Sequence, residues 1–106
     1  MRNLKHMNPK IGDYVLCEEA FSTNSANNKA IDQFIMDNIG QYIKDNKANN
    51  AVSFPYIIFY ENIPNNMKMK GVFIKGEREM SRNEIKHFSK NKEELEIILN
   101  SRKYNL

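Results

Sequence analysis

The chain has 106 residues, a length typical of one domain with one modest core. Sixteen lysines and arginines against 13 aspartates and glutamates give a formal net charge of +3, which permits polyanion binding without requiring it. The single cysteine, Cys17, excludes an internal disulfide, and no apolar run reaches the roughly 18 residues that span a bilayer. We therefore expect one intracellular domain over 1–106, with a flexible segment over 1–10, no leader for secretion and no membrane insertion.

The first half of the chain predicts a strand, a helix and a second strand. The turn dipeptide Gly12-Asp13 precedes a short apolar run, whereas the apolar residues from Ala30 to Ile35 recur at helical spacing. Gly40 can close that helix in a left-handed conformation. In order, we expect a strand over 13–18, a loop over 22–28, a helix over 29–38, a strand over 41–44 and a turn over 45–50.

The second half begins with the strongest strand signal, a run of aromatic and β-branched residues after Pro55. At the other end, Leu95, Ile98 and Leu99 form the apolar stripe of a helix whose first turn is acidic. In order, we expect a strand over 54–60, a turn over 62–66, a strand over 70–75, a short strand, turn and extended segment within 78–89, and a helix over 92–103.

Four stretches carry a resemblance to a known group of proteins. They read I-G-D-Y-V-L-C from Ile11, N-I-G-Q-Y-I from Asn38, Y-I-I-F-Y-E-N-I-P from Tyr56 and E-I-K-H-F-S-K-N-K-E-E-L-E from Glu84. Over 10–99 the chain resembles small uncharacterised proteins of large DNA viruses that look like SH3-like barrels. The resemblance implies a fold, and it transfers no catalytic residue.

We accordingly expect a mainly β fold with added helices. It is an SH3-like, small antiparallel barrel of about five strands, with a short helix between strands 1 and 2 and a C-terminal helix packed on the barrel. The predicted core residues are Val15, Ile43, Ile58, Val72, Ile74, Leu95 and Leu99.

Catalytic and metal chemistry find little support in the residue pattern. Metal binding needs three or four convergent ligands, and His6, His87 and Cys17 stand in separate segments. Folding could join Cys17 and His87 into a nucleophilic pair, but buried strand cysteines usually behave as small hydrophobes. The carboxylates have no apolar setting, and the glycines are too dispersed for a phosphate loop. We expect no enzyme, no metal, no cofactor and no small-molecule substrate.

A basic stretch over 68–92 offers one candidate surface. Eight basic residues there face three acidic ones, and Phe73 and Phe88 are interleaved with them, as in surfaces that neutralise phosphates and stack bases. Lysines that protect the exposed edge of a sheet would give the same pattern. The candidate nucleic-acid ligands are Lys70, Lys75, Arg78, Arg82 and Lys86.

Aromatic residues offer the second candidate surface, a shallow groove or cage for a partner peptide. Packing of these rings in the core, with hydroxyls at its margin, is the alternative, and periodicity favours it. The candidate partner-binding residues are Tyr42, Tyr56, Tyr60 and Phe73. The function that we expect is a non-catalytic module that binds a protein partner, and the alternative is sequence-independent nucleic-acid binding through residues 68–92.

Overall fold

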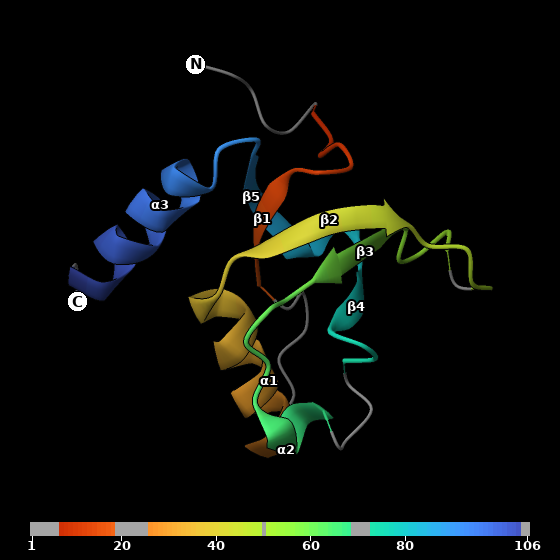
Figure 1. The fold of residues 1–106 in the computed structure, drawn as a ribbon, viewed down its shortest axis with the longest axis horizontal. Helices are drawn as coiled ribbons and strands as arrows, with labels where there is room; N and C mark the ends of the chain where they lie inside the picture. Colours follow the sequence, from red (N-terminus) through yellow and green to blue (C-terminus); the bar gives the residue numbers. More distant parts are fainter. Residues whose placement is uncertain (1–6, 19–25, 50, 69–72, 105–106) are drawn as a thin grey trace.

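Five antiparallel strands form the centre of the molecule, as the computed structural model shows for residues 7–18, 26–49, 51–68 and 73–104 (Figure 1). The elements in chain order are β1 (Tyr14–Cys17), α1 (Ala26–Asp37), β2 (Gly40–Asp45), β3 (Tyr56–Phe59), α2 (Asn65–Lys68), β4 (Glu77–Met80), a 3₁₀ turn (Arg82–Glu84), β5 (Ile85–Ser89) and α3 (Lys92–Tyr104). The strand order is β4-β3-β2-β1-β5, and no pairing within the described residues joins β4 to β5. The fold is therefore mainly β, with an open sheet and added helices.

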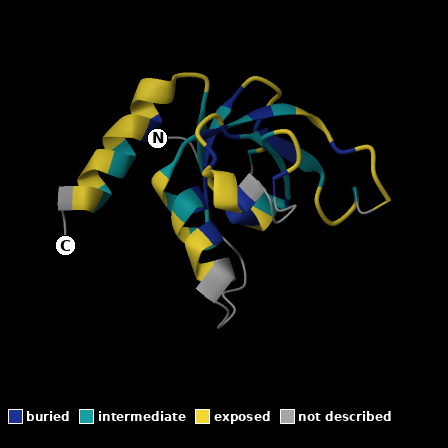
Figure 2. Cartoon of the chain, turned by 60° about the horizontal axis from the view of Figure 1, so that its bottom comes forward, coloured by how far each residue is buried: buried dark blue, intermediate teal, exposed yellow. Residues whose placement is uncertain are grey.

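Helices α1 and α3 cover different sides of β1. Val15 and Cys17 belong to the same buried cluster as Ile35 of α1. Side chains alternate between the two faces of a strand, so Leu16 faces the other side, where α3 packs on β1 and β5 and buries Leu95. Figure 2 shows the exposed residues of α3 along its outer side. Because both faces are covered, all four positions of β1 can be apolar.

Three aromatic rings from separate parts of the chain fill the core between α1 and the sheet. Phe34 lies 5.6 Å from both Tyr60 and Phe73 in edge-to-face geometry, and Tyr60 lies 5.8 Å from Phe73. Edge-to-face pairs are favourable because the positive ring edge meets the negative ring face. This cluster holds α1 against β3 and the segment before β4.

Two β-bulges change the alternation that the sequence suggests. The pairing of β2 with β3 goes from Tyr42↔Ile58 to Lys44↔Ile57, so Ile43 is an extra residue. Its side chain is consequently half-buried rather than buried as predicted. The pairing of β1 with β5 skips Lys86 in the same way. Such bulges bend a strand and increase its twist.

The strand predicted over 70–75 is wrong in its described part. Residues 70–72, with Lys70 and Val72, lie outside the described residues, and Ile74 makes only an isolated bridge to Glu77. Lys75 and Gly76 have φ values of 56° and 80°, which form the tight turn of a hairpin whose second strand is β4. Ile74 is 67% exposed, contrary to its predicted place in the core.

Other boundaries also differ. Helix α1 begins at Ala26, so the end of the predicted loop is helical, and α2 occupies part of the predicted turn over 62–66. The extended segment before the last helix is a full strand, β5. Val15, Ile58 and Leu95 are buried as predicted, whereas Leu99 is half-buried. No helix of the described residues is long and apolar enough to cross a membrane.

Candidate functional site

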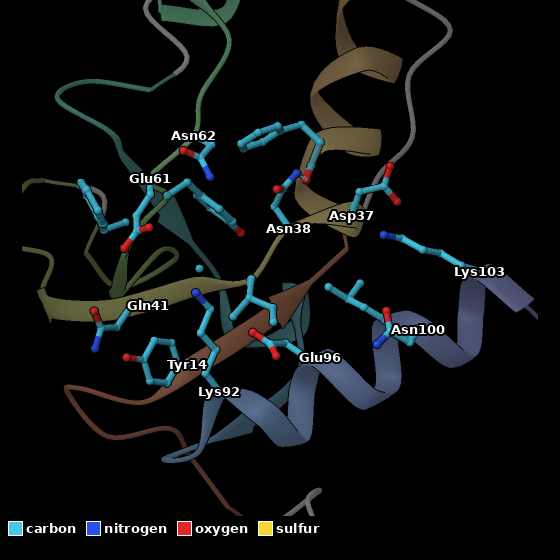
Figure 3. A pocket seen from close by; sticks show the side chains of 16 residues that line it. Tyr14, Asp37, Asn38, Gln41, Glu61, Asn62, Lys92, Glu96, Asn100 and Lys103 are labelled. Atoms are coloured by element: carbon cyan, nitrogen blue, oxygen red, sulfur yellow. Dashed lines mark hydrogen bonds between the residues drawn. The ribbon is translucent and has the colours of Figure 1, made fainter.

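A polar cleft of about 320 Å³ lies between the C-terminal end of α1, the beginning of β2, the end of β3 and one side of α3 (Figure 3). We call it the α1–α3 cleft. Its aromatic and aliphatic floor includes Phe34, Phe59, Tyr60 and Leu99. The polar side chains around it are Tyr14, Asp37, Asn38, Gln41, Glu61, Asn62, Lys92, Glu96, Asn100 and Lys103.

Helix α3 supplies one wall because four of its polar residues share a face. Lys92, Glu96, Asn100 and Lys103 follow one another at intervals of three or four residues, which lie one above another on a helix. Figure 3 shows the amine groups of Lys92 and Lys103 at opposite ends of the cleft, with Glu96 and Asn100 between them. The Lys92 Nζ lies 6.0 Å from the centroid of the Tyr14 ring.

The end of α1 and the beginning of β2 supply the opposite wall. The Asn38 side-chain amide donates to the carbonyl oxygen of Phe34 at 2.8 Å and caps the helix. Gly40 follows, and a Cβ there would lie 2.5 Å from Ile58 Cγ2 and 2.9 Å from the Tyr60 ring. Only glycine therefore lets β2 start this close to the floor of the cleft.

The charges in the cleft are mixed and slightly acidic. Asp37, Glu61 and Glu96 contribute three carboxylates against the two ammonium groups of Lys92 and Lys103, and the negative end of the α1 dipole points the same way. Asp37 accepts a hydrogen bond from Gln33 at 2.8 Å. Within the part of the chain that the structure describes, no hydrogen bond or ion pair engages the side chains of the other four. These groups are therefore available to bind a ligand.

A metal centre is not assembled here or elsewhere in the described residues. Nowhere among them do three histidine, cysteine, aspartate or glutamate side chains come close enough to hold an ion. The α1–α3 cleft can instead offer hydrogen bonds of both kinds, since its amide side chains both donate and accept.

The four predicted partner-binding residues lie mainly in the core. Tyr42, Tyr60 and Phe73 are buried, with 5%, 1% and 2% of their surface exposed, and Tyr56 is half-buried. Tyr42 and Tyr56 meet edge to face at 5.0 Å, and the Tyr42 hydroxyl donates to the carboxylate of Asp45. Burial and this carboxylate raise the pKa of Tyr42.

Two of these residues also reach hollows at the surface. Tyr60 forms part of the floor of the α1–α3 cleft, and together with Phe73 it lines a separate hollow of about 550 Å³. Lys75 lies at the wall of that second hollow. The structure therefore brings one predicted lysine together with two predicted aromatic residues, whereas Tyr42 and Tyr56 line neither hollow.

Arg82, a predicted nucleic-acid ligand, is engaged within the chain. Its Nη2 donates to the carbonyl oxygen of Met7 at 2.8 Å, its Nη1 to that of Ile85 at 2.9 Å, and its Nε to Asn8 Oδ1 at 3.2 Å. The guanidinium also lies 5.3 Å from the Phe88 ring centroid. Arg82 thus fastens the N-terminal segment to the beginning of β5 and has little left for a phosphate.

The remaining predicted basic residues do not form one described patch. Arg78 pairs with Ile58, so it points to the core side of the sheet, and its guanidinium lies 5.8 Å from the Phe73 ring. Lys75 is exposed beside β4, and Lys86 is exposed on β5, at the other edge in hydrogen-bonding order. Lys70 is outside the described residues. Of the four that the structure describes, two are therefore exposed.

Cys17 and His87 do not make a nucleophilic pair. Cys17 pairs with Ile85, and His87 pairs with Leu16 on the other face of β1. Burial raises the pKa of the Cys17 thiol to about 12, so it stays protonated at neutral pH. Burial and the charge of Arg102 lower the pKa of His87.

Sequence reasoning missed the polar residues of the α1–α3 cleft. The helical spacing of Lys92, Glu96, Asn100 and Lys103 was visible, but the same pattern is typical of a solvated helix face. Nothing in the spacing reveals that this face lies opposite the end of α1. Searches of the chain against family models, curated proteins and solved structures find no match.

Proposed function

We propose that this chain is a non-catalytic interaction module and that a segment of a protein partner binds in the α1–α3 cleft. The observation that supports it is a preformed hollow in which Glu61, Lys92, Glu96 and Lys103 have no hydrogen bond or ion pair within the described residues. Three of these charged side chains come from α3 and the fourth from the segment after β3, and they meet around the cleft without pairing with one another.

A protein segment suits this cleft better than an apolar small molecule. Binding sites for small molecules are mostly apolar with few polar groups, whereas charged and amide side chains surround this one. The side-chain amides of Asn62 and Asn100 can pair with the N–H and C=O groups of a partner's backbone. The Gln41 amide nitrogen donates to the Gly12 carbonyl oxygen at 3.0 Å, so its amide oxygen serves as the acceptor. The aromatic floor can cover the stem of a lysine or arginine, whose charge meets Glu61 or Glu96.

We also propose that the fold of this chain is related to SH3-like barrels. A meander in which β1 pairs with both β2 and β5, and in which a 3₁₀ turn joins β4 to β5, is in keeping with it. Membership in the group of small proteins of large DNA viruses would make the partner a viral or host factor inside the infected cell.

The test compares two exposed glutamates of α3. Affinity capture with the full chain identifies a partner, and calorimetry with the purified partner then measures its Kd for the wild type, Glu96→Lys and Glu93→Lys. Glu96 lines the cleft and Glu93 does not. We expect at least tenfold weaker binding for Glu96→Lys, which corresponds to about 1.4 kcal/mol, and less than twofold for Glu93→Lys. Equal Kd values for both variants, or no partner retained at moderate salt, would contradict the proposal.

Nucleic-acid binding is the second candidate function, and fewer exposed basic residues support it than the sequence predicts. Lys75 and Lys86 are the two predicted ligands that are exposed and described. Two phosphate contacts would give a logarithmic salt slope of about −1.8 on duplex DNA. Fluorescence anisotropy across a salt series with the Lys75→Glu/Lys86→Glu variant tests this, and undetectable binding at low salt would exclude it.

A further inference from the structure

A second groove follows the outer edge of β5, on the other side of α3 from the α1–α3 cleft. Its volume is about 930 Å³, and we call it the β5 groove. His87 and Ser89 from one face of β5 line it together with Phe88 from the opposite face. A hollow that touches side chains on both faces of a strand runs along the edge of that strand.

The backbone of β5 is available on this edge. Among the described strands, β5 pairs only with β1, and an edge strand directs alternate N–H and C=O groups away from its partner. Within the described residues, the carbonyl of Ile85 is taken by Arg82, but no backbone hydrogen bond reaches the outer side of β5 from 86 to 90. The bulge at Lys86 confines regular pairing to 87–89.

Two walls make this edge a slot rather than an open strand. On one side, Arg82 holds the N-terminal segment through Met7 and Asn8. On the other side, α3 contributes Leu95 and Ile98. An extended chain in this slot could therefore pair with β5 through its backbone and place its side chains against both walls.

The charges of the β5 groove differ from those of the cleft. Its exposed charged side chains are those of Lys10, Lys90 and Glu94, and the Glu94 carboxylate accepts a hydrogen bond from the Ser89 hydroxyl at 2.8 Å. The other carboxylate, that of Asp13, is buried, with 6% of the residue exposed, and accepts a hydrogen bond from the Lys10 amide at 2.8 Å. Two exposed ammonium groups against one exposed carboxylate give the accessible surface of the groove a net positive charge, which favours an acidic occupant.

We propose that the β5 groove binds an extended acidic segment of a partner protein, which adds to the sheet as a strand beside β5. Backbone hydrogen bonds to the outer side of 87–89 give the affinity, and Lys10 and Lys90 select acidic side chains. The β5 groove and the α1–α3 cleft share no lining residue, so either site can exist without the other.

The test selects peptides from a random twelve-residue display library on the folded full chain. Enriched peptides should carry net negative charge, and their Kd should rise at least tenfold with Lys10→Glu/Lys90→Glu. Methylation of alternate backbone amides in a selected peptide should abolish its binding, since it removes the donors that pair with β5. The Glu96→Lys variant should bind these peptides as well as the wild type does.

Circular dichroism and thermal melting check that each variant is folded, which is expected because both lysines are exposed. An enriched set without acidic residues, binding that survives amide methylation, or binding lost in Glu96→Lys would overturn the proposal. So would a failure to enrich any peptide, or a dimer in sedimentation that Lys10→Glu/Lys90→Glu dissociates, because a second copy would then occupy the edge.

Discussion

Replacing Arg82 by methionine tests whether the N-terminal segment is held by one side chain. Methionine keeps much of the volume over Phe88 but removes the three hydrogen bonds to Met7, Asn8 and Ile85. A hydrogen bond from a charged donor contributes about 1.5–3 kcal/mol, and a cation–π contact about 0.5–1 kcal/mol. Arg82 is half-buried, so water replaces part of the stabilisation that these contacts provide. We expect a loss of about 2–4 kcal/mol.

Urea unfolding at equilibrium measures this loss, and an unchanged m-value shows that the unfolding reaction is the same. Hydrogen exchange shows where stability is lost. The amides of Lys10 and Asp13 are hydrogen-bonded close to the N-terminal segment that Arg82 holds, so they should exchange faster in the variant. The matched control is Lys86→Met on the neighbouring strand, where a surface change should stay within about 0.5 kcal/mol. A loss for Arg82→Met no larger than that of the control would refute this role.

Three further predictions concern packing and pH. Leu95→Ala should lower the free energy of unfolding, measured in urea, by about 2–5 kcal/mol because the side chain is buried. Leu99→Ala should lower it clearly less because Leu99 is half-buried, and equal losses would contradict the assigned burial. Gly40→Ala should destabilise by at least about 1–3 kcal/mol, because its Cβ would overlap Ile58 and Tyr60, and a neutral result would mean that β2 starts elsewhere. The folded pKa of His87 lies below its ordinary 6.5, so the unfolded state binds the proton more tightly and stability should fall as the pH drops below about 6.5. His87→Gln should flatten this part of the stability curve, and an unchanged slope would contradict it.

The sequence predicts the elements that strong local patterns specify. The apolar run of β1, the aromatic run of β3 and the capped helix α3 are found within a few residues of their predicted bounds. Their patterns agree with their burial, so local preference and tertiary structure point the same way. The stretch that forms β5 was predicted only as an extended segment, because Lys86, His87 and Phe88 mix charged, polar and aromatic side chains without the alternation of a half-buried strand.

Burial of single residues depended on registers that the sequence does not reveal. Ile43 would face the core if β2 alternated regularly, but a bulge makes it an extra residue. Ile74 is β-branched, as strand residues often are, but it lies beside the turn formed by Lys75 and Gly76. The cause at Ile43 is a change in register, which moves a side chain to the other face, whereas at Ile74 it is a turn in place of the predicted strand.

The candidate sites could not be predicted from spacing because α3 serves both of them. Glu96 and Leu99 line the α1–α3 cleft, whereas Leu95 and Ile98 line the β5 groove. Neighbouring residues of one helix thus belong to different sites, and only the position of α3 on the sheet assigns them.

Because α3 lines both proposed sites, any ligand that shifts this helix in one site would couple it to the other. Near its C-terminal end, α3 is held by Arg102, which lies 3.5 Å from both the Glu18 carboxylate and the carbonyl oxygen of Met36. These contacts are long for charged hydrogen bonds, so α3 is held mainly by the packing of buried Leu95 against the sheet. A ligand that moves α3 in the cleft changes the wall of the β5 groove, and linkage requires that each ligand alter the other's affinity by the same factor. Equal Kd values for a β5-groove peptide, with and without saturating cleft partner, would show that α3 is rigid.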